Sequence, residues 1–367
     1  MSNRLSIAVM PGDGIGLEVT PAALAVVDKA LSLAGAPGLD HRPLHVGAKA
    51  YLDTGTDFSD EAKQVATDAD AIYLGAMGLP SVRKANGTEI FPQVELRFLL
   101  DLYAGVRPTR AIPGVPTPLA DPRAAEIDFA LVRESTEGLF ASVGKGVVEN
   151  DERASDTQVI TRATTEKLSR FAFDLADHRA ARRTATRRSQ VTLIDKANVF
   201  ASFAFMRKVF DEVAAGRTTD VERLYVDAST LAFLGRPWLF DVIVTENMFG
   251  DILSDLAAGL VGGMGYAPSA DIGDGHAVFQ PAHGSAPDIA GSGKANPTAA
   301  ILSGAMMLEW LGMRHDIPAM VDAAGLIEHA VDGAFAGGGL LTAELGGTAG
   351  VREVTDGVLS ALHAGRG

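Results

Sequence analysis

The chain has 367 residues, of which 47% are hydrophobic and 21% are charged, and its formal net charge is −14. The length allows about two domains with an ample core, and the composition excludes a disordered chain. The chain has no Cys, which excludes disulfides, thiolate metal sites and cysteine nucleophiles, and the negative charge repels phosphate backbones, so we expect no nucleic-acid partner.

In chain order, short β-rich runs alternate with longer helical patterns. Strands with helices after them are predicted at 5–10 and 16–33, at 191–194 and 198–214, and at 242–244 and 249–260, with further strands at 71–74, 129–132 and 224–226. The alternation predicts an α/β fold with much of its sheet parallel. If the Pro-rich stretch 108–122 and the Gly-rich stretch 259–265 are crossover points, the middle of the chain is an inserted domain and the two ends form the other.

Two further patterns bear on location and partners. The apolar run at the start is too short for a signal peptide, and no stretch approaches about 18 apolar residues, so we expect a cytoplasmic protein with no membrane contact. A run of five arginines has no interleaved aromatic residue, and we interpret it as a solvated helix end and connector: Arg179, Arg182, Arg183, Arg187 and Arg188.

Two glycine-containing loops are candidate ligand loops. Residues 11–16 follow a strand and open a helix, but a dinucleotide fingerprint would need glycine where the chain has Leu17, so a Rossmann site is disfavoured and a plain tight turn stays open. In the loop 283–291, small residues allow backbone to approach a ligand, and Asp288 could accept from ribose hydroxyls; the alternative is an ordinary connector.

Charged residues form three further candidate groups. Asp251 and Asp255 are four apart on one predicted helix face, which fits either a solvated acidic face or a hard cation such as Mg²⁺ or Mn²⁺, with Asp227 as a possible third ligand. Lys196 follows a predicted strand and is either a base or a surface lysine. Three arginines in apolar or Gly/Pro contexts are either single salt-bridge partners or a clamp for a di- or tricarboxylate: Arg97, Arg107 and Arg133.

Taken together, these strings resemble the β-decarboxylating 2-hydroxyacid dehydrogenases, the family of isocitrate, isopropylmalate, tartrate and D-malate dehydrogenases. The likeness runs nearly from end to end, through 11–16, 97–108, 132–134, 195–198, 247–255, 283–291 and 346–350. It implies an isopropylmalate-dehydrogenase-like two-domain α/β fold, non-Rossmann, with a discontinuous first domain. Residues 1–105 plus 262–367 would bind the cofactor, and 106–261 would bind substrate and metal and form the homodimer.

The resemblance also implies roles for the charged groups. The three arginines would hold the carboxylates of a small hydroxy-diacid substrate, with Gln93 and Val94 beside its third carbon. Asp251 and Asp255, with Asp227 of the partner subunit, would bind Mg²⁺ or Mn²⁺. Lys196 would reach across the dimer and help to remove the hydroxyl proton.

For the cofactor, the resemblance implies that the loop 283–291 cradles the adenosine half of NAD. Asn296 would contact adenine. Asp288 and Ile289 look like the NAD version, because NADP enzymes of the family tend to carry Lys and Tyr there. The implied cofactor residues are His283, Gly284, Ser285, Ala286, Asp288, Ile289 and Asn296.

Two departures from the family bear on the reaction. A polar Gln93 beside the third carbon favours a small or hydroxylated substituent over isopropyl, so we expect malate or tartrate as the substrate. A 3-substituted malate that resembles isopropylmalate is the alternative substrate. Phe140 stands where the family has a tyrosine that protonates the product after decarboxylation. The alternatives are therefore oxidation without decarboxylation, or a non-catalytic regulatory subunit, although the intact charged residues argue against the latter.

The loop makes a testable prediction about cofactor choice. A carboxylate at Asp288 would repel the 2′-phosphate of NADP, so NAD should have the higher kcat/KM. Steady-state kinetics with both cofactors measures this, and equal values would refute the assignment.

Overall fold

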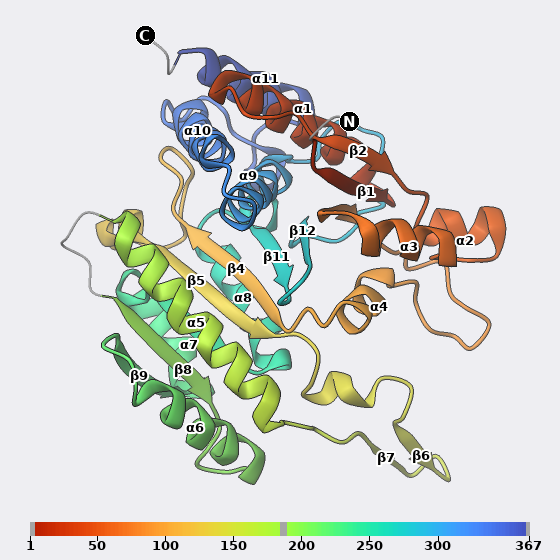
Figure 1. The fold of residues 1–367 in the computed structure, drawn as a ribbon, viewed down its shortest axis with the longest axis vertical. Helices are drawn as coiled ribbons and strands as arrows, with labels where there is room; N and C mark the ends of the chain where they lie inside the picture. The colour runs from red at the N-terminus through yellow and green to blue at the C-terminus, as the bar shows by residue number, and fades with distance from the viewer. Residues whose placement is uncertain (1–3, 184–188, 365–367) are drawn as a thin grey trace.

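The computed structural model describes residues 4–183 and 189–364, so Arg187 and Arg188 of the arginine run lie outside the described residues. Ten strands form one sheet in the order β2-β1-β3-β12-β11-β4-β5-β10-β8-β9 (Figure 1). In chain order their bounds are β1 Ser6–Gly12, β2 Asp40–Pro43, β3 Ala71–Ala76, β4 Ala104–Arg110, β5 Asp128–Glu134, β8 Gln190–Asp195, β9 Asp220–Tyr225, β10 Val242–Thr245, β11 Pro268–Ile272 and β12 Ala277–Pro281. Two short strands, β6 (Val147–Glu149) and β7 (Arg153–Ser155), pair only with each other.

Most neighbouring strands are parallel, as the alternation predicted, but the centre of the sheet is not. β11 runs antiparallel to both β12 and β4, and β4 runs antiparallel to β5. The mixed α/β class is therefore confirmed, with an antiparallel centre that the sequence pattern did not predict. One half of the sheet, from β2 to β11 in the strand order, comes from residues 6–76 and 268–281. The other half, from β4 to β9, comes from residues 104–245.

Helices cover both faces of the sheet. The longer helices are α1 Gly16–Ala34, α5 Arg162–Arg182, α6 Ala201–Ala214, α8 Asn247–Leu260, α9 Thr298–Arg314, α10 Pro318–Phe335 and α11 Val351–Ala364. The shorter ones are α2 Ala48–Thr54, α3 Asp60–Asp68, α4 Pro92–Leu99 and α7 Val226–Gly235. In Figure 1, α5 crosses in front of β5 and β8, and α7 and α8 lie behind them.

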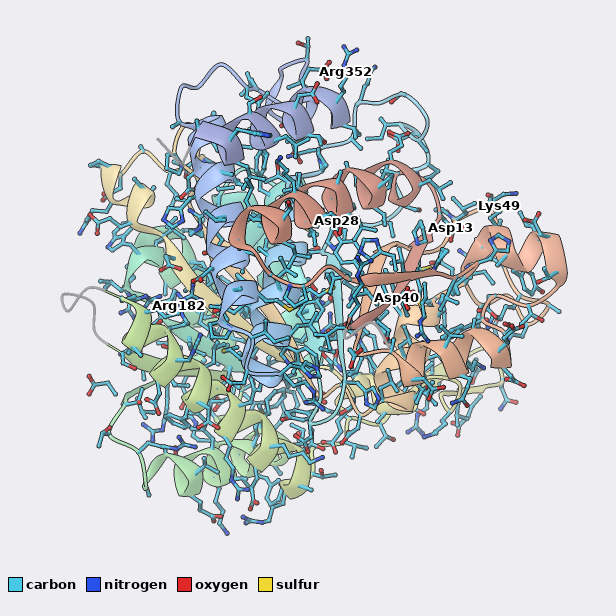
Figure 2. All side chains as sticks on the ribbon, turned by 45° about the horizontal axis from the view of Figure 1, so that its top comes forward. Asp13, Asp28, Asp40, Lys49, Arg182 and Arg352 are labelled. Atoms are coloured by element: carbon cyan, nitrogen blue, oxygen red, sulfur yellow. The ribbon has the colours of Figure 1, made fainter. Side chains whose placement is uncertain are left out.

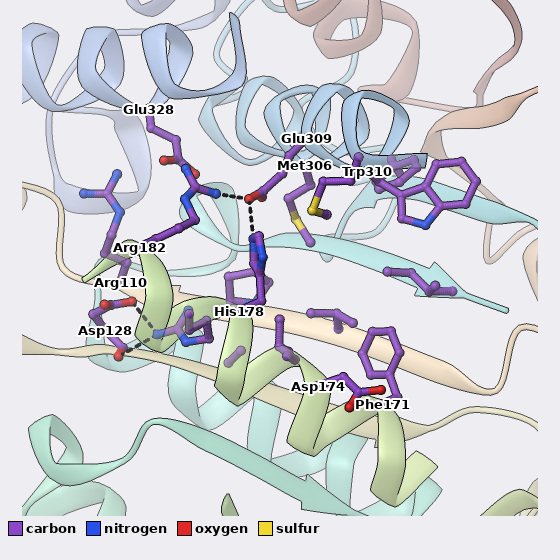
Figure 3. Close-up of a pocket in the computed structure, with 18 of the residues that line it drawn as sticks. Arg110, Asp128, Phe171, Asp174, His178, Arg182, Met306, Glu309, Trp310 and Glu328 are labelled. Atoms are coloured by element: carbon purple, nitrogen blue, oxygen red, sulfur yellow. Dashed lines mark hydrogen bonds and ion pairs between the residues drawn. The ribbon is translucent and has the colours of Figure 1, made fainter. Parts of the chain in front are cut away.

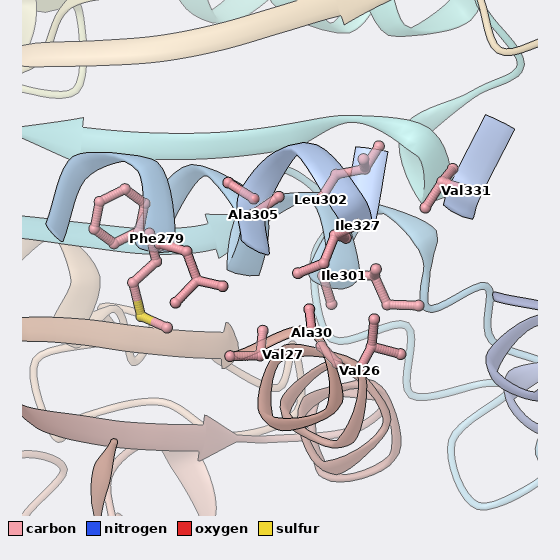
Figure 4. Packing of buried hydrophobic residues seen from close by; sticks show 14 of the residues in the cluster. Val26, Val27, Ala30, Phe279, Ile301, Leu302, Ala305, Ile327 and Val331 are labelled. Carbon is pink, nitrogen blue, oxygen red and sulfur yellow. The ribbon is translucent and has the colours of Figure 1, made fainter. Parts of the chain in front are cut away.

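Each face has two separate apolar cores, one on either side of the central strands. On one face, α1, α9, α10 and α11 pack on β1, β3, β11 and β12 around residues such as Val27 and Ile301 (Figure 4), and α5 and α6 pack on β5, β8 and β10. On the opposite face, α3 and α4 pack on β1 and β3, and α7 and α8 pack on β5, β8 and β10. The strands β11 and β4 lie where the two cores of the first face meet, because Ala270 of β11 belongs to one core and Ala104 of β4 to the neighbouring one.

The loop after β1 joins three segments. Gly12 and Gly14 have φ of 75° and 55°, a conformation that glycine adopts readily. The carboxylate of Asp13 accepts from the backbone N–H of Ala48, Lys49 and Gly78 at 2.8, 2.9 and 2.8 Å. Figure 2 labels Asp13 and Lys49, which lie close to each other. The backbone N–H of Ile15 donates to the carbonyl of Ser285 at 2.8 Å, which fixes this turn against the loop 283–291.

The prediction that the arginine run is a solvated helix end holds for Arg182, which ends α5 and is 42% exposed, but it is wrong for Arg179 and Arg183. Arg179 and Arg183 donate to the carboxylate of Asp241 at 3.0 and 2.6 Å, and that side chain is only 1% exposed. A carboxylate so buried requires cationic partners. Arg182 pairs with Glu309 on α9. Among the described residues, no helix is both long enough and apolar enough to cross a membrane.

Substituting Gly14 tests whether the turn holds the loop 283–291. A Cβ at Gly14 would overlap the carbonyl of Ser285, whereas Gly35, with φ of 69°, has no atom within 4 Å of the same position. Gly35→Ala should therefore cost about 1 kcal/mol from backbone strain alone. Gly14→Ala should cost about 3 kcal/mol or more, because overpacking adds to the strain.

Urea unfolding of both variants measures the difference. Equal destabilisation would contradict the packing of the turn against Ser285.

Candidate active site

A cavity of about 250 Å³ lies on the α4 and α8 side of the central strands. Its walls come from the ends of β3 and β12, from α4, β4 and β5, and from the start of α8. Its lining includes the predicted substrate residues and five others that bear on the chemistry: Gln93, Val94, Arg97, Arg107 and Arg133, then Phe140, Asp251, Gln280, His283 and Gly284. The structure thus brings together side chains that lie far apart in the sequence.

The three arginines are nearly inaccessible to solvent. Arg97, Arg107 and Arg133 have 6%, 8% and 3% of their surface exposed. Burial lowers the pKa of Arg107, while the charge of Asp271 opposes the shift. Burial, and then the charge of Arg97, lower the pKa of Arg133 to about 10, so the neighbouring guanidinium charge destabilises the charged form of Arg133.

Asp271, on β11, is the counter-ion of two of these arginines. Its carboxylate accepts from Arg97 Nε at 3.0 Å and from Gln280 Nε2 at 2.9 Å, and it lies 3.8 Å from Arg107 Nη2. Burial raises the pKa of Asp271, but the charges of Arg97 and Arg107 outweigh burial and hold it below its ordinary value. Asp271 therefore stays ionised, holds Arg97 through a hydrogen bond and balances the charge of Arg107.

Arg133 is held instead from the start of α8. Its Nε and Nη2 donate to Asn247 Oδ1 at 2.9 and 2.6 Å, and its Nη1 donates to Asp251. Asn247 donates in turn to Glu134 Oε2 at 3.3 Å. The side chain of Glu246 accepts from the N–H groups of residues 248 and 249, which caps α8 and sets the position of Asn247.

Three buried polar atoms of the cavity lining have no hydrogen-bond partner: Arg107 Nη1, Gln93 Oε1 and His283 Nε2. Leaving a buried polar group unpaired costs free energy, and more if it is charged. Burial lowers the pKa of His283, so at neutral pH its ring is uncharged. The cavity therefore suits an anionic ligand that also carries neutral hydrogen-bonding groups.

The predicted metal ligands are brought together only in part. Asp251 and Asp255 lie on the same helix, and burial and then the charge of Asp251 raise the pKa of Asp255, as expected for two adjacent carboxylates. Asp227, in the first turn of α7, pairs instead with Lys196. Within the described residues of this single chain, no three His, Cys, Asp or Glu side chains form a group that could hold a metal.

The predicted cofactor loop lies beside the cavity. His283 and Gly284 line it, and Ser285 Oγ donates to the carbonyl of Gly78 at 2.5 Å. Ala286 and Ile289 pack against the core formed by α1 and α9. Asn296 is 8% exposed, and its amide binds Glu344 Oε1 at 2.7 Å. The roles of these residues, and of Asp288, stay predictions.

Phe140 lies on a short 3-10 helix, Leu139–Ser142, with Arg133 5.2 Å from its ring centroid. None of the tyrosines lines the cavity. Three of them use their hydroxyls elsewhere, because Tyr73 donates to Ala300 O, Tyr103 to Asp274 and Tyr266 contacts Thr342. The described residues therefore place no phenol where the family's proton donor is expected.

Asp271, Gln280 and Asn247 are site residues that the sequence reasoning missed. The first two lie on β11 and β12, which were not predicted as strands, and their partners are distant in sequence. The sequence did contain one signal for Asp271. It is the acidic residue of the short run 268–272, and an acidic side chain needs a cationic partner if such a run is buried.

Comparisons with known proteins agree with this architecture. Residues 6–358 match the family model described as isocitrate/isopropylmalate dehydrogenase. The chain is 40% identical to the 3-isopropylmalate dehydrogenase of Corynebacterium kroppenstedtii, over 93% of this chain and 97% of that one. It is also 40% identical to the 3-isopropylmalate/3-methylmalate dehydrogenase of Methanocaldococcus jannaschii, over 95% and 96%.

Two solved structures are similar over nearly their whole length. Isocitrate dehydrogenase from Methylococcus capsulatus has a TM-score of 0.82 at 35% identity, covering 98% of this chain and 99% of that one. A β-decarboxylating dehydrogenase from Thermococcus kodakarensis has a TM-score of 0.79 at 36% identity, covering 98% and 96%. The chain is thus a dehydrogenase, an oxidoreductase acting on a CH–OH group. It belongs to the isocitrate/isopropylmalate dehydrogenase family.

Removing the charge of Asp271 tests its role as counter-ion. Asp271→Asn leaves two buried guanidinium groups without it and should lower the free energy of unfolding by about 3 kcal/mol or more. Asp274→Asn is the matched control, because that side chain is 70% exposed and should cost less than about 1 kcal/mol.

The pH dependence of the difference has a definite sign. The pKa of Asp271 is lowered from 3.8 in the folded chain, so its stabilisation is fully present above that value and is lost as the pH falls below it. Urea unfolding at several pH values should show the gap between wild type and Asp271→Asn shrinking only in strong acid. A gap that closes near neutral pH would contradict the assignment.

Proposed function

We propose that the chain oxidises a malate-type 2-hydroxy diacid, with NAD as acceptor and Mg²⁺ or Mn²⁺ as a second cofactor. The observation that supports this most directly is the convergence of three buried arginines on one cavity, with Arg107 Nη1 left unpaired. Guanidinium groups bind carboxylates through paired hydrogen bonds, and a diacid would supply both the charge and the missing acceptors.

The residues present fit both cofactors. Asp251 and Asp255 offer the oxygen ligands that a hard cation prefers, and the cation would relieve the repulsion that raises the pKa of Asp255. Bound there, the cation would act as a Lewis acid toward the substrate hydroxyl, and NAD would accept the hydride. The loop 283–291 would hold the adenosine half of NAD beside the cavity. Asn296 would reach the adenine only if its bond to Glu344 opened.

The proposal requires a homodimer. Asp227 and Lys196 pair with each other and lie outside the cavity lining, so they would complete the site from the partner subunit. Exposed apolar side chains on α7 and α8 support such an interface, with Leu231, Leu234 and Ile252 at 72%, 54% and 63% exposed. Lys196 would then accept the hydroxyl proton. In this arrangement, residues 1–105 plus 262–367 bind the cofactor, and 106–261 bind substrate and metal and form the dimer.

The substituent on the third carbon is the open choice within this class. Gln93 and Val94 lie in the wall, and Gln93 Oε1 is a buried acceptor without a donor, which a substrate hydroxyl would satisfy. A hydroxyl on the third carbon favours tartrate, whereas D-malate, the smaller acid of the same class, carries only hydrogens there and would leave Gln93 Oε1 unpaired. The names of the relatives favour a 3-alkylmalate, which Val94 could contact.

The test is NADH formation over a panel of D-malate, tartrate, 3-methylmalate and 3-isopropylmalate, with and without Mn²⁺. We expect metal-dependent turnover, with the highest kcat/KM for the smaller or hydroxylated acids. Gln93→Leu should shift the ratio of kcat/KM by about tenfold toward 3-isopropylmalate, because it replaces an amide by an apolar side chain.

Gln64→Leu is the matched control for this shift, since Gln64 binds Asp68 on the exposed side of α3. Absence of NADH with every acid in the presence of metal would contradict the proposal and favour a regulatory subunit.

A second candidate has the same fold and substrate but stops after oxidation. It is favoured by Phe140, because a phenyl ring against Arg133 cannot donate the proton that a decarboxylated product needs. The proton would then come from water or another donor, or decarboxylation would be slow.

Phe140→Tyr distinguishes the two outcomes. We expect less than one CO₂ per NADH in the wild type, and a ratio closer to one in Phe140→Tyr, which restores a phenol at this position. CO₂ release and NADH formation are measured in the same reaction. A one-to-one ratio in the wild type, with no gain in rate in the variant, would show that the missing hydroxyl does not matter.

A further inference from the structure

A second cavity, of about 510 Å³, lies on the opposite face of the central strands, between α5 and the helices α9 and α10 (Figure 3). Its volume is in the range of ordinary small-molecule sites. Among the described residues, none lines both cavities. The proposed dehydrogenase reaction therefore does not account for it.

The two cavities are back to back across a single layer of backbone. Successive side chains of a strand point to opposite faces. Four strands each contribute side chains to both faces. One side chain of each strand lies in the first cavity or against its arginines, and another, which points to the opposite face, lines the second cavity. The pairs are Arg107 and Pro108 on β4, Arg133 and Ala130 on β5, Asp271 and Ile272 on β11, and Gln280 and Phe279 on β12.

The lining of the second cavity is divided between apolar and cationic ends. Figure 3 shows Trp310 and Met306 at one end, with Phe171 on the opposite wall, and Arg110 and Arg182 at the other end. The hydrocarbon part of a ligand would lie against the aromatic and thioether side chains, and a polar head would meet the guanidinium groups.

The cationic end retains donors that the protein does not use. Arg110 Nη1 donates to both oxygens of Asp332, at 2.7 and 2.9 Å, but its Nη2 has no partner. Arg182 donates to Glu309 through Nη1 and is still 42% exposed. Burial, and then the charges of Arg182 and Arg179, lower the pKa of His178.

We propose that this cavity is a second small-molecule site, which binds an elongated carboxylate with an aromatic or aliphatic body. The carboxylate would bind Arg182 and the body would lie along Met306 and Trp310. The cavity shares four strands with the arginine cluster on the opposite face of the sheet.

An amine is the less favoured ligand. Glu309 accepts from Arg182 and lies 3.1 Å from His178 Nε2, so its charge is already balanced. Asp128 is likewise bound by Arg179 and Arg183. Glu328 is the remaining carboxylate at this end, and it should weaken anion binding.

The test uses tryptophan fluorescence and a probe of fixed shape. The chain has two Trp, so Trp238→Phe leaves Trp310 as the only reporter. In this background, 4-phenylbutyrate should give a saturable change with a dissociation constant at or below about 5 mM. The alcohol 4-phenylbutan-1-ol and the amine 4-phenylbutylamine, of matched length, should bind about tenfold more weakly or worse.

Variants then locate the carboxylate. Arg182→Gln should weaken 4-phenylbutyrate binding about tenfold, and Glu328→Gln should tighten it. Arg170→Gln is the matched control, because Arg170 is on the same helix, 61% exposed and outside the cavity. If Arg182→Gln does not fold, Glu328→Gln still decides. Three results would each overturn the proposal. They are the absence of a saturable fluorescence change, tighter binding of the amine or the alcohol than of 4-phenylbutyrate, and binding of 4-phenylbutyrate to Glu328→Gln that is no tighter than to the parent.

Discussion

The structure depends on how positive charge is tolerated at the centre of its sheet. Three guanidinium groups with less than a tenth of their surface exposed share one small cavity, and their mutual repulsion is offset by carboxylates and an amide supplied from other elements. Asp271 serves Arg97 and Arg107, and Asn247 with Asp251 serves Arg133. The orientation of the three guanidinium groups therefore depends on β11 and on the start of α8, which lie outside the strands and helix that carry the arginines.

Much of the fold could be predicted from the sequence, because the strands with continuous apolar runs are buried on both faces. The predicted strands at 71–74, 129–132, 191–194 and 242–244 lie within β3, β5, β8 and β10. β4 was missed because Arg and Pro interrupt its pattern, and β11 and β12 are only five residues long. The antiparallel centre could not be predicted, since strand order depends on long-range pairing that local periodicity does not encode.

In the site, the residues that could be predicted are charged side chains in apolar or Gly/Pro-rich stretches of sequence, which the family resemblance also indicates. Arg97, Arg107 and Arg133 do converge, and Asp251 lines the same cavity. Features that depend on residues distant in sequence could not be predicted. They are the pairing of Asp271 with Arg97 and the hydrogen bond between Asn296 and Glu344. The same holds for the buried atoms of Arg107 and Gln93 that the fold leaves without a partner. Asp227 pairs with Lys196 outside the cavity, and its proposed role lies across a subunit boundary.

The strand order has a consequence for synthesis. β4, β5, β8, β9 and β10 come from one continuous stretch and can pair as soon as they are made, but β3 gains its second neighbour only when β12 arrives, and Tyr73 then binds Ala300 across 227 positions of chain. Until that moment β3, which is buried at all six positions in the finished fold, is an apolar edge with free hydrogen-bonding groups. A nascent chain is therefore open to intermolecular strand pairing along β3 until β12 has been made.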